Sequence, residues 1–184
     1  ARIVSVSGAT GEGLPELVSA IEDLLGETSP KKDVGRPRLP IDRSFTITGF
    51  GTVVTGTLID GSLQVGQEAE LAVSGRRTRI RGLQTHRQKE ERAEPGTRVA
   101  ANLTGVPHEE ISRGEVLTVP GWLRPTTAFD VHLRVIPDAP HPLRHNMFVT
   151  VHTGSSEVIA RLRLLEGDRA EPGETTWAQL KLEA

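Results

Sequence analysis

The sequence of 184 residues contains no cysteine, few aromatic residues and no long apolar run. Without cysteine, the chain forms no disulfide and offers neither a thiolate metal ligand nor a cysteine nucleophile. Because aromatic residues make up only 3%, valine, isoleucine, leucine and alanine must fill most of any core. No apolar run approaches the roughly 18 residues of a membrane-spanning helix, and no signal peptide is visible. We therefore expect a cytoplasmic protein without membrane partners.

The stretch Pro40–Thr57 carries the clearest strand pattern in the chain. Its first half alternates, so Ile41 and Arg43 are expected on one face of a strand and Asp42 on the other. The glycine-rich residues 49–51 interrupt the alternation before a second β-branched run begins. Two strands hinged on glycines suit a closed, strongly bent sheet, since glycine tolerates the backbone angles of sharp turns and bulges.

Short strands continue along the rest of the chain, separated by glycine-containing turns. The dipeptides DG at 60–61 and SG at 74–75 are hairpin signals, and the strand spacing is typical of a small barrel. From residue 122 the same pattern restarts and is still running at the last residue, which predicts a second, incomplete barrel. The pentapeptide RAEPG occurs at 92–96 and again at 169–173, so both barrels are expected to use the same tight turn.

The first residues follow a different pattern, of α/β type. Residues 2–7 predict a short buried strand, and residues 14–25 predict a helix with an apolar stripe. One βα unit cannot bury both faces of its strand, so we expect its neighbours upstream of this sequence. The predicted fold class is mainly β, with two small antiparallel β-barrels preceded by one βα unit. The predicted organisation is a strand and helix at 1–27, a polar linker at 28–37, a first barrel at 38–120 and an incomplete barrel at 121–184.

The formal net charge of −2 hides one strongly basic segment. Residues 76–92 contain seven basic and two acidic side chains, a local net of +5. Arg77, Arg79 and Arg81 share one strand face, and such a row of guanidinium groups can meet a phosphate backbone. A solvated strand face with cross-strand ion pairs explains the row equally well.

Asp42, Arg43 and Arg98 form a candidate anion site. Both arginines begin strands, and Arg98 follows a Pro-Gly turn. Two guanidinium groups beside a carboxylate can hold an anionic ligand, with Asp42 orienting a guanidinium or binding an ammonium group. On the pattern alone, an ordinary surface ion pair is the better interpretation.

No pattern indicates catalysis or metal binding. The six histidines show no ligand spacing, and neither a Ser/His/Asp grouping nor a carboxylate pair stands out. We therefore assign no catalytic residue and no metal ligand. The glycine-rich residues 7–13 can present backbone amides to an anion or a base, but they lack the lysine and Ser/Thr of a Walker loop. On the pattern alone, they indicate a plain βα turn.

Several segments together resemble a translational GTPase of the elongation factor Tu superfamily. SGATGEGL is similar to the SAxxGxGL loop that contacts guanine in that family, with Gly8 in place of alanine. PIDRSFTITGFGTVVTGTL resembles the start of its domain 2, and RIRGLQTH, PGTRVAANLTGV and ISRGEVL follow. The resemblance is strong to about residue 120 and covers the end of the GTP domain, domain 2 and part of domain 3. Elongation factor Tu usually carries acidic IEDVF where this chain has IDRSF, which favours the selenocysteine-specific elongation factor.

The resemblance implies a role for each candidate site. Asp42, Arg43 and Arg98 match the selenocysteine pocket, whose arginines would favour an ionised selenol over the neutral hydroxyl of serine. The guanine loop is matched by Ser7, Gly8 and Ala9. No GxxxxGK[ST], DxxG or NKxD motif is present, so this fragment is expected to be no enzyme and to hold no bound cofactor.

The same resemblance implies a longer parent protein. That parent would be a GTPase using GTP and Mg²⁺, with selenocysteinyl-tRNA, the ribosome and the selenocysteine insertion hairpin of messenger RNA as partners. Two alternatives stay open. One is a general elongation or initiation GTPase that carries ordinary aminoacyl-tRNA, and the other is a β-barrel interaction module without a nucleic-acid role.

Overall fold

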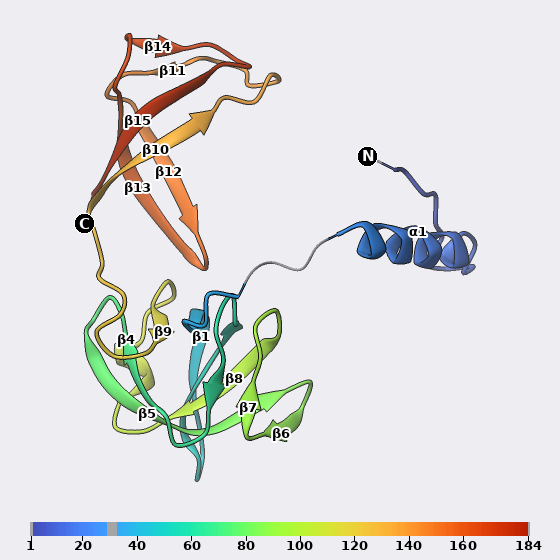
Figure 1. Cartoon of the computed structure of the whole chain (residues 1–184), viewed down its shortest axis with the longest axis vertical. Helices are drawn as coiled ribbons and strands as arrows, with labels where there is room; N and C mark the ends of the chain where they lie inside the picture. The colour runs from blue at the N-terminus through green and yellow to red at the C-terminus, as the bar shows by residue number, and fades with distance from the viewer. Residues whose placement is uncertain (1, 29–32, 184) are drawn as a thin grey trace. The chain divides into compact units, whose positions relative to one another are not determined.

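The computed structural model describes residues 2–28 and 33–183, which divide into two units at residues 33 and 34. The first unit carries helix α1 (Leu14–Glu27), and the second is built almost entirely of antiparallel strands (Figure 1). No helix in the described ranges combines the length and apolar character that crossing a membrane requires. The predicted linker at 28–37 includes residues 29–32, which lie outside the described residues.

Helix α1 begins where the sequence predicts it. Pro15 lies in its first turn, where a missing N–H costs nothing, and Glu16 complements the positive end of the helix dipole. Gly13 caps the helix at φ 76°, and a Cβ there would lie 2.1 Å from the carbonyl oxygen of Ser5. The turn into α1 therefore requires glycine at this position.

The predicted buried strand at residues 2–7 is wrong. The segment has no strand structure, and the Ile3 side chain is 92% exposed. A strand needs a hydrogen-bonding neighbour, and no strand in the described part of the chain pairs with these residues. The apolar stripe of α1 is exposed as well, and the described residues of the first unit contain no sheet for it to pack against.

The predicted first barrel is confirmed. Six strands follow one another in the order β4-β9-β1-β2-β8-β5, and pairing of β4 with β5 closes the ring. Small aliphatic side chains fill it, including Leu39, Val54 and Leu117, all fully buried. The barrel strands are β1 (Arg38–Ile47), β2 (Gly51–Thr57), β4 (Glu68–Leu71), β5 (Arg76–Thr85), β8 (Arg98–Leu103) and β9 (Val116–Thr118).

Shorter elements decorate the barrel. Strand β6 (Gln88–Glu90) extends the edge at β5, and β3 (Leu63–Gln64) pairs with β7 (Arg92–Ala93). A short 3₁₀ helix, η1 (His108–Glu110), precedes β9. The Ser44 hydroxyl on β1 lies within hydrogen-bond distance of the His108 carbonyl in η1 (3.1 Å) and of the Ile111 carbonyl just after it (2.9 Å).

Strand β1 departs from regular alternation at the candidate site. Ile41 pairs with Gly56 and Arg43 pairs with Thr55, so Asp42 forms a β-bulge between them. A bulge adds one residue to one strand and moves the following side chains to the other face. Ile41 is therefore buried while Arg43 is exposed, and the prediction that they share a face is wrong.

The hairpin predicted at Asp60-Gly61 is wrong, because its flanking strands β2 and β3 do not pair with each other. Asp60 is buried, and its carboxylate accepts hydrogen bonds from the Val34 N–H (2.9 Å) and the Gly61 N–H (2.8 Å). A buried carboxylate needs such donors. The loop at 60–61 therefore folds around the Asp60 carboxylate instead of forming a two-stranded hairpin. The second predicted hairpin, at 74–75, does join β4 to β5.

The second all-β region, predicted as an incomplete barrel, is an open sheet in the described residues. Its four strands run in the order β10-β15-β13-β12, and no described strand bridges its two edges. Leu162, Leu164 and Ala178 are buried on the inner face. The strands are β10 (Ala128–Arg134), β12 (Phe148–Thr153), β13 (Ser156–Leu164) and β15 (Thr175–Leu182), with β11 (Leu143–Arg144) pairing separately with β14 (Arg169–Ala170).

The two RAEPG copies adopt the same local structure, as predicted. In each copy the Arg-Ala pair forms a two-residue strand, β7 or β14, against a short partner. The glycine that ends each copy has positive φ, 84° at Gly96 and 90° at Gly173. Each of these glycines also donates its N–H to a carbonyl oxygen far back in the chain: Gly96 to Leu58 and Gly173 to Val135.

Candidate anion site on the first barrel

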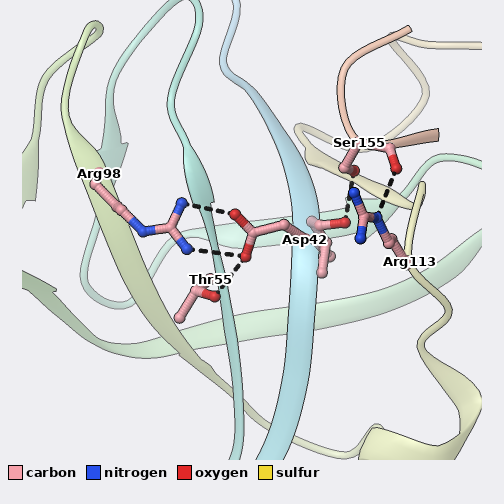
Figure 2. A network of polar contacts seen from close by, with 6 residues as sticks. Asp42, Thr55, Arg98, Arg113 and Ser155 are labelled. Carbon is pink, nitrogen blue, oxygen red and sulfur yellow. Dashed lines mark hydrogen bonds and ion pairs between the residues drawn. The ribbon is translucent and has the colours of Figure 1, made fainter. Parts of the chain in front are cut away.

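Three adjacent barrel strands bring Asp42, Thr55 and Arg98 together. The Arg98 guanidinium faces the Asp42 carboxylate in a two-pronged contact, with nitrogen–oxygen distances of 2.6 and 3.0 Å (Figure 2). The Thr55 hydroxyl lies on the strand between them and donates to the same carboxylate at 2.8 Å. We call this arrangement the Asp42–Arg98 clasp. A fork of this kind is the strongest geometry for an ion pair.

The two charged groups of the clasp shift each other's pKa, and both are reachable from solvent. The hydrogen bond from Arg98 is the main cause that lowers the pKa of Asp42, against a smaller opposing effect of burial. The same hydrogen bond raises the pKa of Arg98. The Asp42 side chain is 28% exposed and that of Arg98 56%. A ligand can therefore reach both charges without opening the core.

Arg43 lies beside the clasp without joining it. It is exposed and pairs along the ladder with Thr55. Its positive charge also lowers the pKa of Asp42. Among the described residues, no side-chain hydrogen bond or ion pair engages its guanidinium. The structure thus brings Asp42 and Arg98 into contact, and the guanidinium of Arg43 near them has no polar partner in the described part of the chain.

Thr55 is the site residue that the sequence reasoning missed. Its hydroxyl reaches Asp42 only because the bulge in β1 places two residues opposite Thr55. Regular alternation does not predict that pairing. The signal available in the sequence was Thr55 itself, a hydroxyl side chain that follows the two valines of the run TVVTGT.

The basic face of β5 is real but largely neutralised. Arg77, Arg79 and Arg81 are exposed and alternate with buried residues, as predicted. Glu70 stands directly opposite Arg77, and their charged atoms are 4.0 Å apart; Arg79 and Glu68 form an equivalent pair at 3.7 Å. Cross-strand ion pairs therefore account for two of the three arginines. Within the described residues, Arg81 has no ion pair.

The predicted guanine loop forms a compact turn in the first unit. Ser7 holds the turn, since its N–H donates to the Glu12 carbonyl and its carbonyl accepts from the Gly11 N–H, both at 2.9 Å. Gly8 and Ala9 are exposed. No group of three or more His, Asp or Glu side chains suited to a metal ion occurs in the described ranges.

Residues 51–118 match the family described as elongation factor Tu domain 2. The selenocysteine-specific elongation factor of Desulfomicrobium baculatum is 45% identical over 181 residues, and elongation factor Tu 2 of Streptomyces avermitilis is 30% identical over 191. Each alignment covers 98% of this chain, but the chain spans only 28% and 49% of those proteins. A crystal structure of a bacterial selenocysteine-specific elongation factor superposes over the whole chain and 29% of its own length, with a TM-score of 0.79. At 23% identity, that match establishes a shared fold.

Proposed function

We propose that the first barrel of this chain, a relative of the selenocysteine-specific elongation factors in the elongation factor Tu superfamily, binds the selenocysteinyl end of a tRNA. The parent protein would deliver this tRNA to the ribosome in the cytoplasm, at codons marked by the selenocysteine insertion hairpin. The 45% identity to a relative of that name supports this reading over a general carrier of aminoacyl-tRNA. The match of residues 51–118 disfavours an unrelated interaction module.

The observation that carries the proposal is the Asp42–Arg98 clasp with Arg43 beside it. A selenocysteinyl ester carries a cationic α-ammonium group and, at neutral pH, an anionic selenolate. Asp42 and the two arginines offer the complementary charges on one exposed corner. We propose an exchange of ion-pair partners. The ammonium group of the ester binds the Asp42 carboxylate, and the selenolate replaces that carboxylate at Arg98, with Arg43 as the second cation.

This exchange explains discrimination against serine. A seryl ester also offers an ammonium group, but its neutral hydroxyl cannot replace the Asp42 carboxylate at Arg98. Serine would leave Arg98 without an anion, whereas selenolate restores a charge-assisted contact. Cysteine is the closer competitor, because a few per cent of its thiol is ionised at neutral pH whereas the serine hydroxyl stays neutral.

The GTP-dependent part of the function concerns the parent protein. Bound GTP and Mg²⁺ would supply the hydrolysis step that releases the tRNA. The turn of half-buried Ser7 and exposed Gly8 and Ala9 fits a contact to the guanine base, and a Cβ added at Gly8 would meet nothing within 4 Å. This chain lacks the phosphate-binding motifs, so we assign no catalytic residue within it.

The test is a titration of the intact factor with GTP against selenocysteinyl-, seryl- and cysteinyl-tRNA. We expect tight binding of the first only, with discrimination over serine of about 100-fold or more. Equal affinity for all three tRNAs would favour a general aminoacyl-tRNA carrier. Absence of binding to any of them would reject the proposed role in translation.

A further inference from the structure

A turn of the second sheet lies against the start of β1, one residue from the clasp. The Ser155 hydroxyl, in the turn between β12 and β13, donates to the Ile41 carbonyl at 2.6 Å. A second hydrogen bond crosses the same contact: Nε of Arg113, in the loop before β9, donates to the Ser155 carbonyl at 3.0 Å. Figure 2 shows these contacts beside the clasp. We call this region the docked turn.

The docked turn fits too closely to admit extra side-chain atoms. Gly154 has φ 57°, and a Cβ there would lie 2.9 Å from Cβ of Pro40. Across the contact, Gly114 has φ 99°, and its Cβ would lie 3.0 Å from Cβ of Ser156. Glycine is thus required on both sides, by backbone conformation and by space.

The docked turn holds the carbonyl of Ile41, which belongs to the peptide group between Ile41 and Asp42. The Ile41 carbonyl also accepts from the Gly114 N–H at 3.1 Å, and the Ile41 N–H donates to the Glu115 carbonyl at 2.8 Å. Because a peptide group is planar, fixing this carbonyl fixes the plane from which Asp42 departs. The bulge lies at that point, where the barrel ladder gives least support.

We infer that Ser155 is a positioning residue: by holding the Ile41–Asp42 peptide, it sets the Asp42 carboxylate for Arg98 and couples the second sheet to the anion site. Release of the docked turn leaves this peptide with fewer restraints, so the clasp loosens. Coupling of this kind is reciprocal, so a change in the partners of Asp42 also changes the stability of the docked turn. The effect on tRNA choice rests on the proposed function, whereas the coupling itself does not.

The experiment uses NMR on the 184-residue chain, following the Asp42 carboxyl carbon and the Arg98 Nε–H, with the Gly114 amide as reporter of docking. Ser155→Ala is compared with Gly154→Ala, which displaces the turn, with Ser155→Thr, which keeps a hydroxyl, and with Thr150→Ala, an exposed control on β12. We expect both alanine changes in the turn to shift the Gly114, Asp42 and Arg98 signals together. The threonine variant should restore them at least in part, and the control should leave them unchanged.

In the intact factor, Ser155→Ala should lower the preference for selenocysteinyl- over seryl-tRNA by roughly fivefold or more. A Gly114 shift with unchanged Asp42 and Arg98 signals would overturn the coupling and leave a simple interdomain contact. An unchanged Gly114 signal in both turn variants would show that the turn is not docked, which also overturns it. If the wild type shows no tRNA preference while the NMR signals move together, the proposed function fails and the coupling stands.

Discussion

At the scale of single residues, Asp42 is the group on which the site depends. Its carboxylate accepts from Arg98 and Thr55 and lies near the charge of Arg43. In the free protein it occupies the place that an anionic ligand would take. On the proposed function, binding would therefore exchange one ion pair for another instead of filling an empty pocket.

The lowered pKa of Asp42 predicts a pH-dependent contribution to stability. A carboxylate whose pKa falls on folding stabilises the protein above its unfolded pKa of about 3.9, and this stabilisation is lost as pH drops through the folded value. Asp42→Asn should therefore lower the free energy of unfolding by at most about 1 kcal/mol at pH 6. The difference from wild type should shrink as pH falls below about 4.

Denaturant unfolding between pH 2.5 and 7, at steps of about half a pH unit, measures this difference. Asp130→Asn is the matched control, since the contact of the Asp130 carboxylate within the described residues is a hydrogen bond from the neutral Gln179 amide (3.1 Å). A wild-type advantage that grows as the solution is acidified would contradict the assigned direction.

At the scale of elements, the bulge in β1 places the side chains of Asp42 and Arg43 at the site. Gly56 lies opposite Ile41 and is buried, and a Cβ there would lie 2.1 Å from the Pro40 carbonyl oxygen. The close approach of β1 and β2 at this point therefore depends on glycine. The bulge would have to move to admit any side chain.

Gly56→Ala should destabilise the chain by about 1–3 kcal/mol, because an added methyl group forces the backbone of β1 to shift. Gly82→Ala is the control, since it is also a strand glycine but has nothing within 4 Å of an added Cβ. Thermal unfolding of both variants gives the comparison. Equal stability of the two would contradict the close approach that we describe.

The sequence predicted the elements well where local signals decide them. Helix α1, the glycine interruption between strands at 49–51, the turn at 74–75 and the alternating arginines of β5 all follow from periodicity and turn chemistry. The bulge at Asp42 was not predictable, because alternation assumes an unbroken ladder. The contact with Thr55 depends on that bulge and was missed with it.

At the scale of the whole molecule, the second unit combines a closed barrel with an open sheet, and the two repeat one turn sequence. Closure was predicted for the first and not reached in the second, since closure depends on strands that pair at both edges. Residues 2–7 and the exposed stripe of α1 show the same limit. Local sequence specifies an element, but only its neighbours determine whether it is buried.

The distribution of charge over the barrel predicts how RNA binding responds to salt. Arg81 has no ion pair among the described residues, whereas Arg79 faces Glu68 at 3.7 Å. If the β5 face meets tRNA phosphates, affinity should fall steeply with ionic strength. Arg81→Ala should then reduce the slope of log affinity against log salt by up to about one, and Arg79→Ala by less.

Binding of tRNA to the intact factor, measured from about 50 to 200 mM salt, tests this prediction. Arg169→Ala, on the short strand β14 and paired with Glu171, serves as control. A flat salt dependence, or equal slopes for Arg81→Ala and wild type, would remove the β5 face from the interface.

The most direct test of the central claim is the ratio of affinities for selenocysteinyl- and seryl-tRNA in intact wild-type, Arg98→Ala and Arg43→Ala factors. The proposed exchange of ion pairs predicts a large ratio in wild type. It predicts a near loss of that ratio in Arg98→Ala and a clear reduction in Arg43→Ala, with seryl-tRNA affinity changed little. A ratio that stays at the wild-type value in both variants would show that the selenolate is recognised elsewhere.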